Sequence, residues 1–212
     1  MPGMAASSSI FERIQLPEDQ FETHLLEWFI PEKNQSLTSY AKKMAENIHH
    51  ENCILIGVSF GGVLVQEIKQ FVNPKKVIII SSVKSNVEFP KRFKVAKTTK
   101  AYKLMPTKLF ENIELLTKFT FGSSIVKQRL ALYEKFLSVR DKRYLDWAIE
   151  QIINWERTEI DPEIIHIHGD ADEVFPPKYI KDFIPIKNGT HIMILNKYKW
   201  LNENLPKILL GD

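Results

Sequence analysis

The segment Gly57-Val58-Ser59-Phe60-Gly61 places one serine between two glycines, after an apolar run and before a pattern of helical spacing. It fits the pattern G-x-S-x-G, in which the serine occupies a sharp strand-to-helix turn. The two glycines let the strand and the helix pass closely, and the strained turn exposes the hydroxyl. The free N–H groups of the first helical turn point toward it. We therefore predict that Ser59 is a nucleophile.

A serine hydroxyl is a weak nucleophile until a base takes its proton, and the usual base is a histidine oriented by a carboxylate. Downstream, "IIHIHGDADEVFPP" (164–177) places Asp170 and Asp172 directly after an apolar run. "IPIKNGTHIMIL" (184–195) places His191 after the next apolar run. The order serine, acid, histidine is one that serine hydrolases use. His191 is the candidate base, and both aspartates are candidates for the acid.

Alternating strands and helices must position these groups. Four short runs are apolar on both faces, as strands that are covered on both sides must be. The predicted strands are 21–29, 53–58, 75–83, 163–169 and 182–189. The predicted helices are 7–16 (with a serine cap), 36–50, 61–72 and 193–210. This alternation predicts an α/β protein with a mostly parallel sheet and helices on both faces. The candidate groups would then meet at the carboxyl edge of the sheet.

The alternation breaks between Val83 and Asp161, where no buried strand is predicted. Helical patterns occupy this interval instead, over 106–119, 123–139 and 141–157. We interpret 84–160 as a helical cap inserted between two core strands. The chain is then a single domain, 1–212, that contains this insertion.

Taken together, the motifs resemble those of α/β-hydrolase-fold serine hydrolases. "GVSFGG" resembles the nucleophile elbow of that family, and "NGTH" resembles the turn that carries its histidine, His191 here. "HGDADEVFP" resembles the segment H-G-x-x-D-x-x-x-P that carries the acid of the family, which favours Asp172 over Asp170. The resemblance spans most of the chain, and 84–160 takes the place of the family's cap. These motifs are specific for the fold and not for a substrate.

A fourth match lies at the start of the sequence, where "PGMAAS" (2–7) resembles the family's oxyanion loop. The resemblance implies that the N–H groups of Phe60 and of Met4 or Ala5 bind the oxyanion. In the family an apolar strand precedes this loop and lies beside the nucleophile strand, whereas here only Met1 stands in that place. We expect either a start inside a longer protein or a gap or altered pairing beside the 53–58 strand. Such an edge leaves main-chain groups unsatisfied.

The resemblance implies cleavage of a carboxylic ester through an acyl-enzyme intermediate. Ser59 attacks, His191 transfers the proton, and Asp172 orients the imidazole. No cofactor and no metal is implied, and the expected partner is a small-molecule acyl substrate. Thioester, amide and acyl-transfer chemistry use the same groups and stay open, as does the oligomeric state. The alternative is a non-catalytic ligand-binding or interaction protein on this fold, which the missing strand motivates.

The amino-acid composition narrows the remaining classes of function and location. The chain has 212 residues, 44% of them hydrophobic, with a net charge of +3 and one cysteine. This composition supports a packed core, and the charge gives no reason to expect a nucleic-acid or membrane partner. Cys53 has no partner for a disulfide and is expected to pack in a buried strand. Neither a secretion signal nor an apolar run of membrane-spanning length is present, so we expect a cytoplasmic protein.

The segment 84–108 has a basic and aromatic texture. It holds eight basic residues and one acid, Glu88, with Phe89, Phe93 and Tyr102 between them. A solvated face of the cap, with its aromatic rings turned inward, is the favoured interpretation. A nucleic-acid surface and a site that steers acidic substrates are the alternatives.

The other histidines are expected to be structural. His168 is expected to bond nearby backbone, and His166 to pack in the core. His49 and His50 are expected to end a helix, where a cation suits the negative end of the dipole. His24 has no evident partner, and no group of His, Asp and Glu residues has a spacing typical of a metal site.

Overall fold

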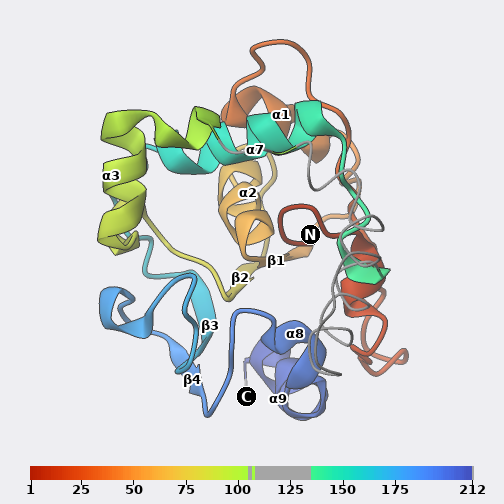
Figure 1. The fold of residues 1–212 in the computed structure, drawn as a ribbon. Helices are drawn as coiled ribbons and strands as arrows, with labels where there is room; N and C mark the ends of the chain where they lie inside the picture. The colour runs from red at the N-terminus through yellow and green to blue at the C-terminus, as the bar shows by residue number, and fades with distance from the viewer. Residues whose placement is uncertain (105–106, 108–134, 212) are drawn as a thin grey trace.

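The computed structural model describes residues 1–104, 107 and 135–211 (Figure 1). Their four strands form one parallel sheet in the order β1-β2-β3-β4. The strands are β1 (Ile54–Val58), β2 (Lys76–Ile80), β3 (Ile165–Gly169) and β4 (Ile184–Ile186). Because all four run in the same direction, their carboxyl ends lie along one edge. The predicted α/β class with a parallel sheet is confirmed.

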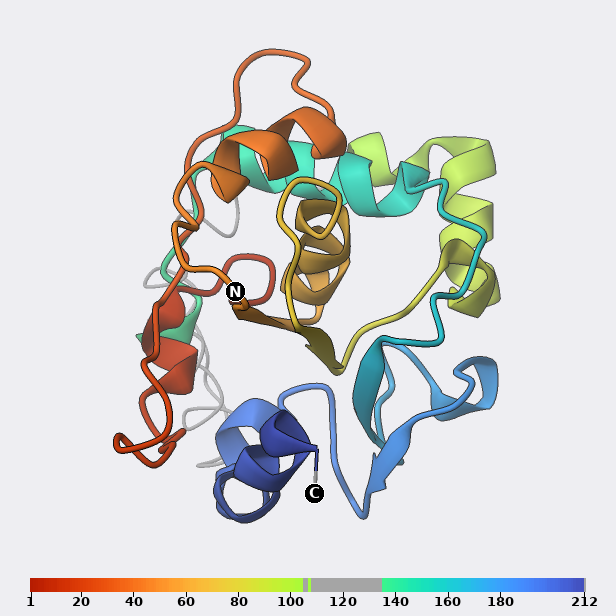
Figure 2. The same cartoon turned by 180° about the vertical axis from the view of Figure 1, so that it is seen from behind.

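Helices cover both faces of this sheet, as Figures 1 and 2 show from opposite sides. The α-helices are α1 (Leu37–Ala45), α2 (Phe60–Ile68), α3 (Lys91–Thr99), α7 (Lys142–Asn154), α8 (Met193–Asn196) and α9 (Tyr198–Leu210). The 3-10 helices are η1 (Ser8–Phe11), η2 (Asn86–Glu88), η3 (Ala101–Leu104) and η4 (Pro177–Tyr179). One core cluster holds side chains of α1, α2 and α7, and the other holds side chains of η1, α8 and α9.

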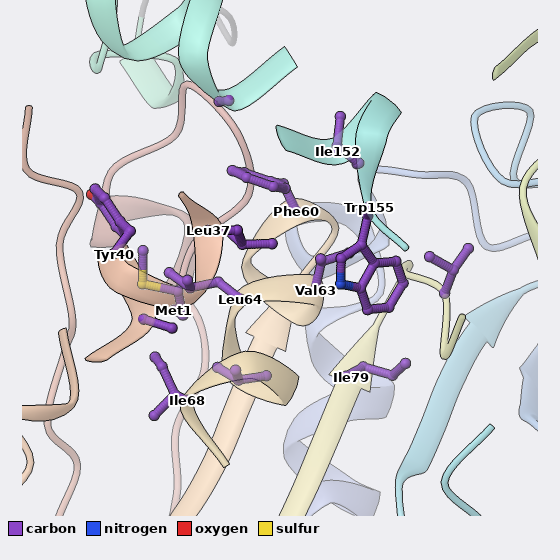
Figure 3. Packing of buried hydrophobic residues seen from close by; sticks show 14 of the residues in the cluster. Met1, Leu37, Tyr40, Phe60, Val63, Leu64, Ile68, Ile79, Ile152 and Trp155 are labelled. Carbon is purple, nitrogen blue, oxygen red and sulfur yellow. The ribbon is translucent and has the colours of Figure 1, made fainter. Parts of the chain in front are cut away.

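Strand β2 illustrates why the apolar runs are continuous. Val77 and Ile79 belong to the α2-side cluster, and Ile78 and Ile80 belong to the α9-side cluster. Successive side chains of a strand point to opposite faces, so a strand that is covered twice must be apolar throughout. Figure 3 shows the first of these faces, where Ile79 lies below Trp155 and Val63 of α2. Strands β2 and β3 are direct neighbours, with Ile78 opposite Ile165 and Ile80 opposite Ile167.

The predicted strand over 21–29 is wrong, because this segment has neither strand nor helix. Its backbone bonds to side chains in place of a neighbouring strand. The N–H of Phe29 donates to the Tyr40 hydroxyl (2.9 Å), which in turn donates to the Phe29 carbonyl (2.8 Å). The Trp28 indole N–H donates to the carbonyl of Gly3 (3.0 Å), which anchors the segment to the start of the chain.

The predicted helices form over shorter spans. The first is only the 3-10 helix η1, and the Ser7 hydroxyl bonds the Ser9 hydroxyl (2.7 Å) without capping it. Helix α1 begins after Ser36, which accepts from the Ser39 N–H, and it ends at Ala45. His49 and His50 therefore lie beyond its end, contrary to expectation. Lys197 separates α8 from α9 in the predicted C-terminal helix.

The described part of the predicted cap, 84–160, is helical and contains no strand. It comprises η2, α3, η3 and α7, and the Asp141 side chain caps α7 by accepting from the Arg143 N–H. The predicted helix over 106–119 and most of the one over 123–139 lie outside the described residues, so the insertion stays a prediction. Across the described ranges, no helix is long and apolar enough to cross a bilayer.

Met1 occupies the free edge of β1, where the sequence predicts a gap or altered pairing. Its amine donates to the Ile56 carbonyl (2.7 Å), and its carbonyl accepts from the Val58 N–H (3.0 Å). These two bonds bracket Gly57 as a residue of a parallel strand would. In the described residues no longer strand pairs with this edge. Cys53 directly precedes β1 and is half-buried, so its predicted place in a buried strand is wrong.

Burial of the Met1 amine predicts a pH-dependent stability. Desolvation lowers the pKa of this amine from 8.0 to about 5, against the attraction of Glu27. Between these values the unfolded chain binds the proton and the folded chain does not, so stability rises with pH from about 5 to 8. The rise from this group is expected to be about 4 kcal/mol. The free energy of unfolding, measured with urea at several pH values, should show this rise when the Met1 amine is free. The rise should be absent after Nα-acetylation. Equal slopes in both forms would contradict the prediction.

Candidate active site

Ser59 lies on a strained turn between β1 and α2. Its backbone has φ 52° and ψ −120°, a positive φ that a residue with a side chain adopts only when its surroundings hold it there. The Ser59 N–H donates to the Ile80 carbonyl of β2 (2.9 Å). The Ser59 carbonyl accepts from the hydroxyl of Ser82 (2.7 Å), just beyond β2. The neighbouring strand thus fixes the turn that presents the hydroxyl.

Glycines flank the turn because the backbone leaves no room for side chains. A Cβ at Gly57 would lie 2.3 Å from the Gly61 carbonyl oxygen, and one at Gly61 would lie 2.2 Å from the Pro2 carbonyl oxygen. The predicted role in close strand–helix passage is confirmed for Gly57, whereas the close contact at Gly61 is with the backbone of Met1 and Pro2. The second contact also shows that α2 rests on the segment that begins the chain.

The structure brings Ser59, His191 and Asp172 into one hydrogen-bonded chain. His191 Nε2 lies 2.9 Å from Ser59 Oγ, and His191 Nδ1 lies 2.9 Å from Asp172 Oδ2. The side chain of Asp172 is fully buried, whereas that of His191 is 22% exposed. Asp170, the other candidate acid, is exposed and does not join this chain.

The surroundings of Asp172 keep it charged. Burial alone would raise the pKa of this carboxyl, but hydrogen bonds from His191 and the Phe175 N–H outweigh it and hold the pKa below its usual value. Oδ1 accepts from the N–H groups of Val174 (2.8 Å) and Phe175 (2.9 Å), which leaves Oδ2 for His191. A carboxylate held in this way fixes the imidazole with Nδ1 protonated and Nε2 free to accept a proton.

His168 and His166 of β3 support the loop that follows this strand and carries Asp172, which we call the acid loop. His168 Nε2 lies 2.8 Å from the carbonyl of Phe175, so the predicted backbone bond of His168 is confirmed. Its Nδ1 lies 3.1 Å from His166 Nε2. Burial lowers the pKa of both rings, so both are neutral near pH 7. The neutral His168 can then donate to Phe175 and accept from His166, which gives the pair one consistent set of protons.

The loops that carry Asp172 and His191 are bonded to each other. The N–H of Asp170 donates to the Ile186 carbonyl (3.2 Å), and the N–H of Ala171 donates to the Gly189 carbonyl (3.0 Å). A Cβ on Gly169 would lie 2.1 Å from that same Gly189 oxygen. Asp172 and His191 therefore lie on two loops that backbone hydrogen bonds hold together, an arrangement that no sequence motif suggested.

The predicted oxyanion donors belong to two segments that lie beside Ser59. Phe60 is the first residue of α2, where the helix dipole favours negative charge. Met4 lies on the opposite loop, which is braced by the bond from the Ala6 N–H to the Gly3 carbonyl (3.1 Å). Both residues line the cavity beside Ser59. Within the described part of the chain, the N–H groups of Met4 and Phe60 make no hydrogen bond.

A cavity of about 590 Å³ opens beside Ser59 and His191. Its walls come from the segment 3–10, from α3 and α7, from the acid loop and from the residues after His191. Nearly all of the lining side chains are apolar. The arrangement can therefore hold an apolar molecule against a hydroxyl that a base can deprotonate.

One group of possible metal ligands lies elsewhere on the surface. Glu22, His24 and His50 are exposed, and their ligand atoms lie within 4.8 Å of one another. His24 Nε2 contacts Glu22 (3.0 Å), and its ring packs 4.2 Å from that of His50, so the structure supplies partners that the sequence did not suggest for His24. Among the described residues no other such group occurs.

The sequence matches no protein-family model and no curated protein. Solved structures do resemble the fold. A hydrolase from Pseudomonas aeruginosa matches with a TM-score of 0.70 and 11% identity, over 100% of this chain and 88% of that one. A thermophilic esterase from Thermogutta terrifontis matches with 0.63 and 12%, over 99% and 88%. A lipase-esterase related protein from Clostridium acetobutylicum matches with 0.63 and 17%, over 97% and 90%. At these identities the likeness shows the fold alone.

Proposed function

Starting from the α/β-hydrolase fold that this chain has, we propose that it is a serine hydrolase that cleaves carboxylic esters through an acyl-enzyme intermediate. One observation carries the proposal: two contacts of 2.9 Å link Ser59 Oγ through His191 to the buried carboxylate of Asp172. An esterase and a lipase-esterase related protein are among the proteins of similar structure, which supports an ester as the bond that is cleaved.

In the first half-reaction, Ser59 Oγ attacks the acyl carbon while His191 Nε2 takes the hydroxyl proton. The carbonyl oxygen becomes an oxyanion, and the N–H groups of Phe60 and Met4 stabilise it. Each donor of this kind contributes about 10²–10³ in rate. As the tetrahedral intermediate collapses, His191 returns the proton to the leaving alcohol, and the acyl group stays on Ser59.

In the second half-reaction, water replaces the alcohol. His191 takes a proton from the water as its oxygen attacks the acyl carbon, and Ser59 leaves with that proton restored. Asp172 stabilises the charged imidazole in both halves and keeps its Nδ1 proton in place. The side chain of His191 is partly exposed, so water can reach the base from the solvent side. No step requires a metal or a cofactor.

Labelling with a fluorophosphonate probe tests the proposal, because the probe reacts only with a serine that a base has activated. The 212-residue chain is expected to be labelled, and the Ser59→Ala variant is expected to stay unlabelled with an unchanged melting temperature. Ser9→Ala, which changes a serine outside the cavity lining, is the matched control and should be labelled fully. A folded chain without labelling would contradict the proposal and favour the alternative of a non-catalytic ligand-binding protein.

A further inference from the structure

We propose that the substrates are neutral esters that are apolar on both sides of the ester bond. This inference rests on the proposed function and names the substrate class of the same site. It follows from the position of the cavity between two apolar clusters, from the placement of the Arg92 side chain at its rim, and from its volume.

The first wall of the cavity comes from α3, α7 and the acid loop. It includes Phe93 and Ala96 of α3, Ile152 of α7, and Phe175. These side chains belong to or pack against the core cluster on the α2 side of the sheet. The Phe93 and Phe175 rings lie 5.7 Å apart, so this wall is aromatic as well as aliphatic.

The second wall comes from the other cluster. It includes Ile10 of η1, Phe136, Ile194 and Leu195, all of which belong to or pack against the core cluster on the α9 side. Ser59 lies at the carboxyl end of β1, between these walls. Both the acyl group and the alcohol of a bound ester therefore meet apolar side chains.

Only one permanently charged side chain, Arg92, is found among the described residues that line the cavity. Its guanidinium donates to the Glu173 carbonyl (2.7 Å) and the Val174 carbonyl (2.5 Å), so it is bound to the backbone of the acid loop. Arg92 is also exposed, which places its charge at the rim. A charged end of a substrate would lose its water inside the cavity and find no partner among the described residues that line its interior.

The volume sets how much of a substrate can be buried. About 590 Å³ lies within the range of cavities that enclose most of a small organic ligand. Each methylene that such a cavity buries in the transition state is expected to raise kcat/KM about fourfold, the rate equivalent of ~0.8 kcal/mol.

The first test compares 4-nitrophenyl esters of acetate, butyrate and hexanoate, followed by the 4-nitrophenyl monoester of adipate. Rates should climb through the three neutral esters by about tenfold or more per step of two methylenes. Adipate has the same chain length as hexanoate but ends in a carboxylate, and its kcat/KM is expected to be at least 100-fold lower. A flat neutral series would overturn the inference, as would a preference for adipate, which would assign Arg92 to carboxylate recognition.

The second test addresses the alcohol side with butyrate esters of hexanol and of 6-aminohexanol, followed by titration of the released acid. The ammonium end should lower kcat/KM at least 100-fold relative to hexanol. Equal rates would show that the alcohol lies in water and would restrict the apolar site to the acyl group, contrary to the inference.

A pair of variants on α3 ties the preference to the cavity. Ala96→Phe narrows the cavity at the first wall and should flatten or reverse the gain in kcat/KM from butyrate to hexanoate. Val95→Phe is the matched control, because Val95 is 59% exposed and does not line the cavity. If both variants keep the original profile, the first wall does not select substrates. Fluorophosphonate labelling of every variant separates this outcome from failure of the proposed function, which would abolish labelling.

Discussion

Asp172→Asn is expected to lower kcat for ester cleavage by about 10⁴. The amide can still accept from Val174 and Phe175 through its oxygen, so the acid loop keeps its bonds. Its NH₂ group then faces His191 Nδ1 and donates to it. The ring must carry its proton on Nε2, which lies 2.9 Å from Ser59 Oγ and can no longer accept the hydroxyl proton.

Asp170→Asn is the matched control for this substitution. It makes the same chemical change two residues earlier, at an exposed side chain outside the hydrogen-bonded chain. Its kcat should stay within about twofold of the original, since a surface substitution of this kind changes little. Steady-state kinetics and melting temperatures of both variants decide the matter. Comparable losses in the two, or more than a tenth of the activity left in Asp172→Asn, would refute the assignment of Asp172.

The second large effect is expected from Gly61→Ala. The added methyl group would lie 2.2 Å from the Pro2 carbonyl oxygen and 2.6 Å from the Met1 carbonyl oxygen. Both are backbone atoms, so no side chain can turn aside to relieve the clash. Helix α2 must move away from the start of the chain, which breaks the pairing of Met1 with β1. We expect a loss of about 3 kcal/mol or more in the free energy of unfolding.

Gly3→Ala provides the comparison for this variant. Its Cβ would meet nothing closer than the Ser59 Cβ at 3.4 Å, an ordinary contact, so the expected loss is below about 1 kcal/mol. Urea unfolding of the two variants measures the difference. If Gly61→Ala unfolded at the same urea concentration as the original chain, the close passage of α2 over Pro2 would not be required for the fold.

The strands were predictable where burial on both faces of the sheet required a short, continuous run of apolar residues. The run 53–58 is too short for a helix and apolar throughout, and its residues 54–58 form β1. The run 21–29 mixes apolar residues with charged and polar ones and does not form a strand; the Tyr40 hydroxyl bonds both backbone groups of Phe29 instead. That partner lies eleven residues away and leaves no local signal, so propensity alone could not separate the two cases.

Prediction of the candidate site depended on the motifs. They singled out Ser59, Asp172 and His191, and the structure places the three in contact, whereas Asp170 lies outside. The sequence could not indicate the bonds between the acid loop and the histidine loop, since these depend on two glycines, Gly169 and Gly189, that approach only in the folded chain. The cavity was equally hidden, because its walls combine side chains from distant segments.

The pairing of β2 with β3 has a consequence for how this protein can change over evolution. The segment between β2 and β3 connects two strands that are hydrogen-bonded neighbours. Both of its ends are therefore held in place by the register of the two strands, with Ile78 opposite Ile165 and Ile80 opposite Ile167. Lengthening a loop between fixed ends adds little entropy cost. The intervening segment supplies one wall of the cavity from α3 and α7. Sequence changes in this segment can therefore alter that wall, and with it the range of substrates, while Ser59, Asp172 and His191 stay in place.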